Sequence, residues 1–210
     1  KCAHICQLGK DERGKQYEQD LEKNSIYVVN KFHHESHRTG RCLVFITPNS
    51  ERTMGTYLGA SEMLEFSMDF MDAVNNSKIL FTEGYQFTSD QNFKAFISVL
   101  ENTDPNVQLA LSLSDPFVVS NFKSRFEDVF SKRIVDYVFC NKEEAIAMAG
   151  ENFVEGLGRI SKNFVVTDGA NSSVISEEGN ISEIEAHAVK AIDSNGAGDI
   201  YAGSVLHKIV

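Results

Sequence analysis

The sequence is poor in proline, has no paired cysteine motif and contains no long apolar run. Its three prolines leave no proline-rich linker that would divide the chain into two domains. The four cysteines have irregular spacing without a Cys-x-x-Cys pair, which favours a reduced, cytoplasmic protein. No apolar stretch approaches the length of a membrane span, and residues 1–7 do not resemble a signal peptide. We therefore expect one domain, residues 1–210, that lies outside the membrane.

Basic residues are also few. The chain has 20 Lys and Arg against 30 Asp and Glu, which gives a formal net charge of −10 and a pI near 5.1. A nucleic-acid or anionic-membrane surface needs a basic patch, so the composition argues against both kinds of partner. It does not exclude a nucleotide ligand, because backbone N–H groups can hold a phosphate in an acidic protein.

Strand and helix patterns alternate along most of the chain. An expected helix at 11–23 precedes two β-rich runs, 26–29 and 42–46, which we expect to form a hairpin or a small sheet. From residue 61 onward, helical stripes at 63–74, 93–100 and 122–130 alternate with strand-like runs at 78–81, 107–113, 135–139 and 164–167. This alternation predicts an α/β fold in which helices cover both faces of a mainly parallel sheet. The β-rich segment 26–57 is interpreted as a lid within that fold.

The most informative stretch is Asp193-Ser194-Asn195-Gly196-Ala197-Gly198-Asp199, which lies between a strand-like run at 188–192 and a helix-like run at 200–210. Glycines at a strand-to-helix turn let backbone N–H groups point at an anion, and the helix dipole adds positive character there. Gly196, Ala197 and Gly198 would then form an anion hole, with Asp199 as a base beside bound phosphate. A bare Gly-x-Gly-Asp pattern is more often only a flexible turn with an acidic first-turn residue.

The longer string resembles the C-terminal signature of the ribokinase-like (PfkB-type) carbohydrate and nucleoside kinases, Asp-Thr-x-Gly-Ala-Gly-Asp followed by a small-residue helix. Ser194 replaces the usual Thr and keeps a hydroxyl, and Gly203 stands where the family keeps a small residue. The resemblance implies a ribokinase-like α/β fold with a small β lid. It also implies ATP-dependent phosphorylation of a hydroxymethyl group on a sugar or nucleoside, with Asp199 as general base and the N–H groups of residues 196–199 on the γ-phosphoryl group.

Asn141-Lys142-Glu143-Glu144 fits two compatible readings. Asn141 with Glu144 three residues later makes a capping box before an apolar helix. The same residues resemble the family's Asn-x-x-Glu element, which implies that Asn141 and Glu144 help place Mg²⁺ and phosphate indirectly, through water. No direct protein ligand to the metal is expected.

Residues 165–172 form a pattern typical of a strand that runs into a turn. They also resemble the family's Thr-x-Gly-x-x-Gly element on the ATP side. Thr167 and Gly169 match that element, Ser172 replaces its last glycine, and Asp168 adds a charge near the expected phosphates. The resemblance implies ATP contacts from Thr167, Gly169 and Asn195.

Two segments around the second β run, 39–42 and 47–54, look like the substrate-lid strands of adenosine kinases and related sugar kinases, with Arg52 as a lid residue. Residues 114–117 also look like the adenosine-kinase-like branch. A surface hairpin with a solvated arginine is the alternative for the lid segments. The resemblance leaves the choice between nucleoside and sugar open, and it allows a homodimer formed through the lid.

Other nucleotide and metal motifs are weak. His33, His34 and His37 lie close together, but no second ligand cluster accompanies them, and a solvated connection is favoured over a metal site. No Gly-x-x-x-x-Gly-Lys-Ser/Thr string occurs, so the common P-loop is absent from this sequence.

The sequence lacks the family's N-terminal substrate motif, with its Asp and Gly-Gly-Asn element, and the family's C-terminal adenine-covering helices. It also has no initiator Met and no C-cap signal in its last helix, so we interpret it as part of a longer kinase. The alternative is a catalytically silent or truncated nucleotide-binding relative. Retention of Asp199 favours the enzyme, because a silent relative need not keep the base.

Overall fold

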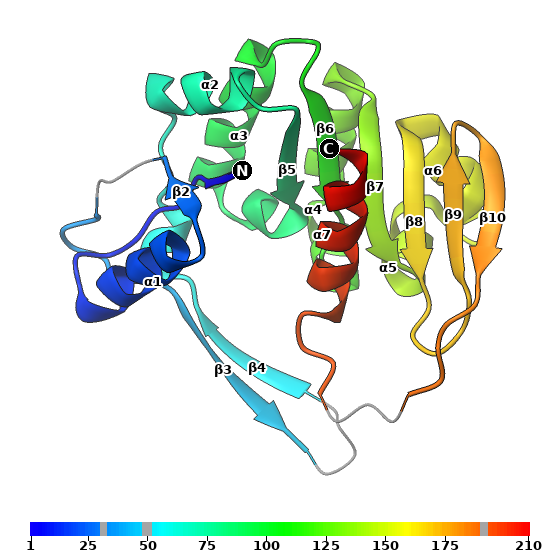
Figure 1. The fold of residues 1–210 in the computed structure, drawn as a ribbon, viewed down its shortest axis with the longest axis horizontal. Coiled ribbons are helices and arrows are strands. Elements are labelled where there is room, and N and C mark those ends of the chain that lie inside the picture. The colour runs from blue at the N-terminus through cyan, green and yellow to red at the C-terminus, as the bar shows by residue number, and fades with distance from the viewer. Residues whose placement is uncertain (30–32, 48–51, 190–192) are drawn as a thin grey trace. The chain divides into compact units, whose positions relative to one another are not determined.

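The computed structural model describes residues 1–29, 33–47, 52–189 and 193–210 (Figure 1). Its chain divides into two compact units, which are described separately. The first unit contains residues 1–76 and 89–103, and the second contains residues 77–88 and 104–210. Within the described ranges, no helix is both long and apolar enough to cross a membrane.

The second unit is built on a six-stranded sheet with the order β10-β9-β8-β7-β6-β5. Its strands are β5 (Ile79–Glu83), β6 (Gln108–Ser112), β7 (Val135–Asn141), β8 (Ser161–Thr167), β9 (Ser173–Glu177) and β10 (Asn180–Ile184). Strands β5 to β8 are parallel, whereas β9 and β10 are antiparallel to their neighbours. The expected mainly parallel sheet is therefore confirmed, with an antiparallel hairpin at one edge. A two-residue turn with positive φ at Glu178 and Gly179 connects that hairpin.

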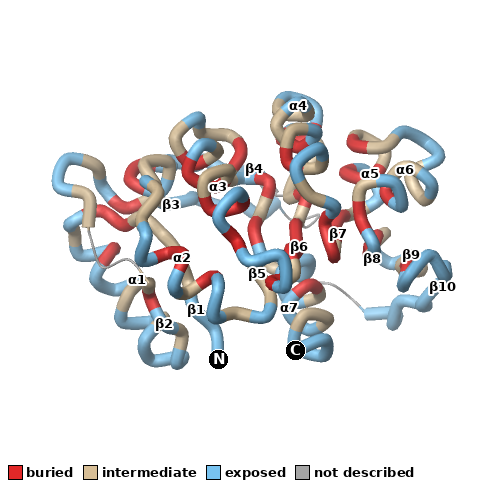
Figure 2. The backbone as a smooth tube through the Cα atoms, turned by 90° about the horizontal axis from the view of Figure 1, so that it is seen from above, coloured by how far each residue is buried: buried red, intermediate tan, exposed pale blue. Residues whose placement is uncertain are grey.

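Helices cover both faces of this sheet, as the alternating pattern predicts. Helices α4 (Pro116–Lys132), α5 (Lys142–Ala149) and α6 (Phe153–Ile160) lie on one face, and α7 (Ala197–Ile209) lies on the other (Figures 1 and 2). Ala202 of α7 is buried against Ala110, Phe139 and Val165 of the sheet. The side chains on the two faces of β6 and β7 are almost wholly buried, as in other parallel sheets.

Two small β pairs and three helices make up the first unit. Its elements are β1 (Cys2–His4), α1 (Glu12–Lys23), β2 (Ile26–Val28), β3 (Arg41–Ile46), β4 (Arg52–Tyr57), the 3-10 turn η1 (Gly59–Glu62), α2 (Met68–Asn75) and α3 (Asp90–Asn102). Strand β2 pairs in parallel with β1, and β3 pairs with β4 as an antiparallel ribbon. The expected pairing of the 26–29 and 42–46 runs is therefore wrong. Strand β2 pairs instead with β1, a short strand near the start of the chain. Sequence periodicity could not identify β1 as the partner of β2.

Two further sequence expectations need correction. The helical stripe at 63–74 starts too early, because Met63 ends η1 and only Phe70, Met71 and Val74 form the buried face of α2. Ala188 and Val189 of the expected strand at 188–192 have no regular secondary structure, and residues 190–192 lie outside the described ranges. The segment before α7 is thus not a parallel strand where the structure describes it.

Gly84 fixes the turn that follows β5. A Cβ atom there would lie 2.6 Å from Cζ of Phe126 and 2.7 Å from the carbonyl oxygen of Leu113. Phe126 is wholly buried on α4, and its ring packs edge-on against Phe87 of the 3-10 turn η2 (Gly84–Thr88), with centroids 4.9 Å apart. The backbone of η2 is therefore pressed directly against the core of the second unit.

Substituting Gly84→Ala should lower the free energy of unfolding by about 1–3 kcal/mol, because the added methyl group meets a buried ring and a backbone oxygen. The matched change Gly158→Ala, in α6, meets no atom within 4 Å and should raise it by roughly 0.5–1 kcal/mol. Urea denaturation of both variants measures the two effects. Equal effects of the two substitutions would contradict this account of the turn.

Candidate active site

The first turn of α7 adopts the geometry that a glycine turn before a helix predicts. Gly196 is the N-cap and has a left-handed backbone with φ of +73°, a conformation that glycine adopts without strain. The Ile200 N–H donates to the Gly196 carbonyl at 2.9 Å, so the helix begins immediately after this residue. Asp199 is exposed in the first turn, where an α-helix leaves N–H groups without intrahelical acceptors.

The residues just before α7 hold one another in a tight turn. The Asn195 N–H donates to Oδ1 of Asp193 at 2.9 Å, and the Ala197 N–H donates to the Ser194 carbonyl at 3.3 Å. Ala197, one of the three residues expected to form the anion hole, therefore has its N–H directed into the turn. Of the expected donors, Gly198 has open space around it, with no atom within 4 Å of an added Cβ.

Asn141 ends β7 and caps α5. Its Oδ1 accepts the Glu144 N–H at 2.8 Å, and the Asn141 N–H donates to Oε2 of Glu144 at 3.1 Å, which completes the predicted capping box. Nδ2 of Asn141 also donates to Oε1 of Glu144 at 2.7 Å. Glu144 is only 5% exposed. Burial raises the pKa of its carboxyl group to about 7, the Asn141 N–H opposes this shift, and the charges of Asp115 and Glu143 add to it.

The end of β8 carries the residues expected on the nucleotide side. Thr167 is its last residue, and Gly169 follows with φ of +56° and open space around it. A cavity of about 650 Å³ lies beside this turn, lined by Lys142, Asp168, Ala170, Asn171, Ser172, Val174, Glu183, Glu185 and Ala186. Nζ of Lys142 lies 3.1 Å from Oδ2 of Asp168. Lys142 therefore offsets the charge that Asp168 brings to this turn, and its hydrogen bond lowers the pKa of Asp168.

Three residues that the sequence motifs did not identify complete this edge: Glu83, Tyr85 and Asp115. Glu83 ends β5, and burial raises its pKa, with a further contribution from the charge of Asp199. The Tyr85 hydroxyl donates to the Ser114 carbonyl at 3.3 Å. Asp115 is the N-cap of α4 and accepts the Phe117 N–H at 2.7 Å. Glu83 ends β5, Tyr85 follows it, and Asp115, which lies in the 114–117 segment noted in the sequence, follows β6. The rule that carboxyl ends of parallel strands meet at one edge could have found all three.

The electrostatics of Tyr85 show which groups lie near one another. Burial raises its pKa to about 12, and four carboxylates add to this shift: Asp115, Glu144, Glu83 and Asp199, in that order. The structure thus brings Glu144 and Asp199 of the predicted site to the same charged edge as Glu83 and Asp115. Arg52 begins β4 in the first unit and its side chain is not described, so its role as a lid residue stays a prediction.

An edge with four carboxylates has the oxygen donors that a hydrated Mg²⁺ prefers. In the described part of the chain, no three His, Cys, Asp or Glu side chains are grouped closely enough to hold a metal ion by themselves. This includes the three histidines at 33, 34 and 37, of which His34 and His37 contact each other edge-on. The donor set therefore fits an ion that keeps its water and is completed by substrate oxygens.

Comparison with known proteins identifies the family. The model of the pfkB family carbohydrate kinases matches residues 1–210. The chain belongs to this family. Adenosine kinase 1 of Arabidopsis thaliana is 25% identical over 234 residues, which include 99% of this chain and 66% of that protein. This pfkB-family chain thus spans about two thirds of the length of the relatives that it matches.

Two solved structures show the same fold. The adenosine kinase of Sinorhizobium meliloti matches with a TM-score of 0.86 and 28% identity, covering 95% of this chain and 63% of its own. A probable sugar kinase protein from Rhizobium etli matches with a TM-score of 0.87 and 27% identity, covering 96% and 63%. The similarity confirms the expected ribokinase-like α/β fold. One neighbour is described as an adenosine kinase and the other as a sugar kinase, so they leave the substrate of the pfkB-family chain open.

The raised pKa of Glu144 predicts a pH dependence of stability. Its carboxyl group has an ordinary value of 4.5 and reaches about 7 in the fold, so the fold favours the protonated form. The stability that this form contributes is fully present below pH 4.5 and is lost as the pH rises through 7, an effect on the order of 2–3 kcal/mol. Glu144→Gln removes the titrating group. The free energy of unfolding of this variant, relative to that of the wild type, should therefore rise by that amount from about pH 5 to about pH 8.

Urea denaturation at both pH values measures this difference. The loss of a hydrogen bond in Glu144→Gln is the same at both pH values and cancels in the comparison. A stability difference that does not change with pH would show that Glu144 titrates normally.

Proposed function

We propose that this chain is the catalytic part of an ATP-dependent phosphotransferase that phosphorylates a hydroxymethyl group of a nucleoside or sugar. The observation that carries the proposal is the first turn of α7, where Gly196 begins the helix with a left-handed backbone and Asp199 lies exposed among open N–H groups. Phosphoryl transfer needs both features, because a donor group must meet the charge on the phosphoryl oxygens and a base must accept the hydroxyl proton. Membership of the pfkB family supports it independently.

Asp199 is proposed as the general base. Its carboxylate is exposed, so a substrate hydroxyl can reach it, and the helix dipole favours its ionised form. Burial, with the charge of Asp199, raises the pKa of Glu83, so of the two carboxyl groups only that of the exposed Asp199 is proposed as the base.

Bound Mg²⁺ would supply positive charge to the phosphate oxygens and to this acidic edge. We propose that Asn141 and Glu144 orient its water. Their side chains are already fixed against each other by hydrogen bonds of 2.7 and 2.8 Å, so they keep their places without a ligand. Thr167, Gly169 and Asn195 are proposed to contact the nucleotide. The cavity beside β8 lies next to the turn that holds Gly169, and it is lined by Lys142 together with the carboxylates of Asp168, Glu183 and Glu185.

The proposal also concerns the substrate, the lid and the compartment of the enzyme. The adenosine kinases among the relatives favour a nucleoside, and we propose adenosine as the first compound to test. Arg52 would close over it from the β3–β4 ribbon. None of the four cysteines forms a disulfide, which agrees with a cytoplasmic enzyme.

Asp199→Asn should lower the rate of Mg²⁺-ATP-dependent phosphorylation by about 10²- to 10⁴-fold, because it removes the base and keeps the shape. The matched control is Asp20→Asn on exposed α1, which makes the same change of charge and should leave the rate within about twofold. The assay compares adenosine, other nucleosides and a sugar panel, with the chain expressed in its natural sequence context.

Transfer to adenosine that Asp199→Asn loses would establish an adenosine-kinase-like enzyme, and transfer to a sugar would keep the mechanism and change the substrate. Near-normal turnover of Asp199→Asn would refute the assignment of the base. ATP binding without transfer to any acceptor would favour a catalytically silent nucleotide-binding relative.

The β3–β4 ribbon is proposed to pair with that of a second copy. Every residue of β3 is exposed, and Leu43 and Phe45, which point to the same side of the strand, are 63% and 60% exposed. Leu43→Ser with Phe45→Ser should convert a dimer to a monomer in sedimentation equilibrium, whereas Ile181→Ser on β10 should not. A wild-type protein that sediments as a monomer would exclude this interface.

A further inference from the structure

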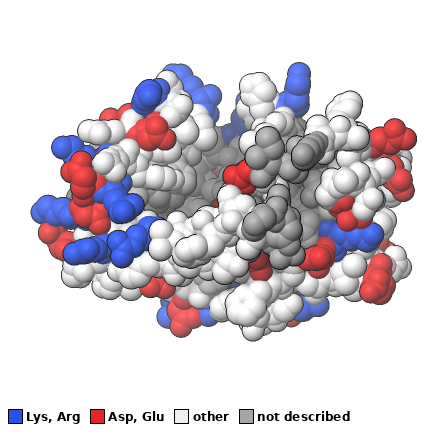
Figure 3. Space-filling view, turned by 90° about the horizontal axis from the view of Figure 1, so that it is seen from below, with Lys and Arg blue, Asp and Glu red and all other residues white. Residues whose placement is uncertain are grey.

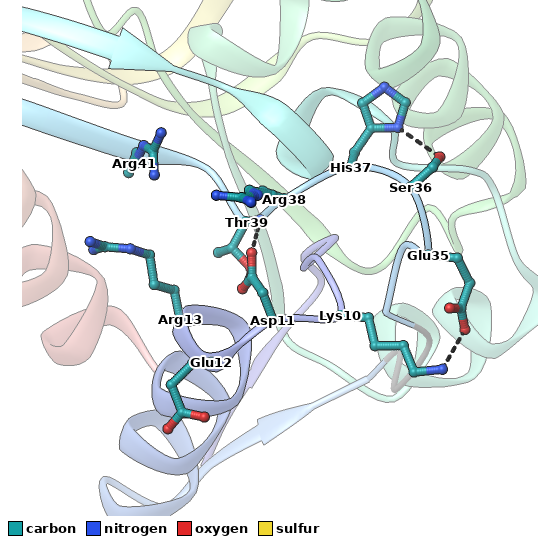
Figure 4. Close-up of a pocket in the computed structure, with 10 residues that line it drawn as sticks. All are labelled: Lys10, Asp11, Glu12, Arg13, Glu35, Ser36, His37, Arg38, Thr39 and Arg41. Carbon is teal, nitrogen blue, oxygen red and sulfur yellow. Dashed lines mark hydrogen bonds and ion pairs between the residues drawn. The ribbon is translucent and has the colours of Figure 1, made fainter.

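A second cavity lies wholly within the first unit and is rich in arginine. Its volume is about 470 Å³ (Figure 4). The residues that line it come from the start of α1 and from the segment leading into β3, and they are Lys10, Asp11, Glu12, Arg13, Glu35, Ser36, His37, Arg38, Thr39 and Arg41. Four of the 20 Lys and Arg of an acidic protein therefore meet at one small cavity.

A network centred on Asp11 holds the two segments of this cavity together. Asp11 caps α1 by accepting the Gly14 N–H at 2.9 Å. It also accepts the Thr39 N–H at 2.9 Å and the Thr39 hydroxyl at 2.7 Å. The Gly9 N–H in turn donates to Oγ1 of Thr39 at 3.0 Å. These bonds join residues 28 to 30 positions apart in the sequence, so the backbone that carries the arginines is fixed in advance.

The backbones of the two segments are also in direct contact. A Cβ at Gly9 would lie 2.4 Å from the Thr39 nitrogen, and a Cβ at Gly14 would lie 2.4 Å from the Gly9 carbonyl oxygen. Hydrogen bonds from Thr39 and Gly14, with a smaller contribution from the charge of Arg38, lower the pKa of Asp11 to about 2. Asp11 is thus a permanent anion whose oxygens are already used by the scaffold.

The cations of the cavity differ in how far they are neutralised. Lys10 forms an ion pair with Glu35, with 2.7 Å between Nζ and Oε1. Arg41 lies over the ring of Tyr57, 5.4 Å from its centroid. In Figure 4 the side chains of Arg13, Arg38 and Arg41 point toward the same side, away from the Lys10–Glu35 pair. Figure 3 shows basic and acidic side chains interspersed over the part of the surface that belongs to the first unit.

We propose that this cavity is a binding site for a small phosphate-bearing polyanion. Planar guanidinium groups bind phosphate oxygens in pairs, and three of them directed at one cavity match a ligand with several such oxygens. The N-terminus of α1 opens into the same cavity and adds to the attraction for an anion. Because the backbone is already fixed, only the arginine side chains lose conformational freedom on binding, which lowers the entropic cost.

Every residue that lines this cavity belongs to the first unit, whereas Asp199, Glu83, Glu144 and the nucleotide cavity belong to the second. Binding to this cavity is measured without turnover, so its failure and the failure of the proposed kinase reaction can be distinguished.

The test is calorimetric titration with inorganic tripolyphosphate. Arg38→Gln combined with Arg41→Gln should weaken the binding by about tenfold or more, because two charge-assisted contacts are lost. Arg159→Gln, which removes one exposed arginine from α6 of the other unit, should change it by less than about twofold. In NMR spectra, the Nε–Hε signals of Arg13, Arg38 and Arg41 should shift on titration, and that of Arg159 should not.

Two further arms decide the nature of the ligand. Inorganic phosphate should bind more weakly than tripolyphosphate, and citrate, a carboxylate of similar charge, should bind at least about tenfold more weakly than tripolyphosphate. Equal binding of citrate and tripolyphosphate would overturn the assignment to phosphate. Tripolyphosphate binding that survives the double substitution undiminished, or arginine signals that do not move, would overturn the site. Because Arg41 begins β3 of the proposed lid, the double variant is judged on tripolyphosphate binding alone and not on the kinase rate.

Discussion

The candidate active site depends on the crowding of negative charge where four parallel strands end. Strands β5 to β8 are in register, so Glu83, Asn141 and Thr167 end their strands at one edge, and the helices that follow must begin there. Each helix needs a capping side chain, and here the caps are Asp115 and Asn141 with Glu144. The same residues that satisfy the backbone thereby concentrate carboxylates around Tyr85. A fold that solves its capping problem with acidic groups creates a place where a cation and a phosphate are needed together.

Charge is handled differently in the two units. In the second unit the carboxylates repel one another, and the raised pKa values of Glu83 and Glu144 express the free energy stored in that repulsion and in burial. In the first unit, Asp11 accepts hydrogen bonds from the backbone and side chain of Thr39 and from the Gly14 N–H, and arginine side chains lie around it. We propose the arrangement of the second unit for a cation and that of the first unit for an anion.

Much of this could be predicted from the sequence, because it rests on local patterns. The capping box at Asn141 and Glu144, the helix after Gly196 and the alternation of strands and helices were all predicted from the residues themselves, and the structure confirms them. The partner of β2 could not be predicted, because strand pairing depends on distant residues and β1 has only three residues. Glu83 and Tyr85 were also missed. Single residues after a strand carry no motif, and their role emerges only when several strands are aligned. The functional roles of Asp199, Thr167, Gly169 and Asn195 stay predictions.

Helix α4 connects the packing of the core with the titration of the site. Its first residue follows the cap Asp115, its backbone departs from helical geometry at Phe122, and beyond that point Phe126 presses on Gly84 at the start of the turn that carries Tyr85. The position of the phenol among its carboxylates is thus set by a hydrocarbon ring in the interior. A substitution that changes the shape of the Phe126 ring would therefore change the acidity of the Tyr85 phenol, although no charged residue is altered.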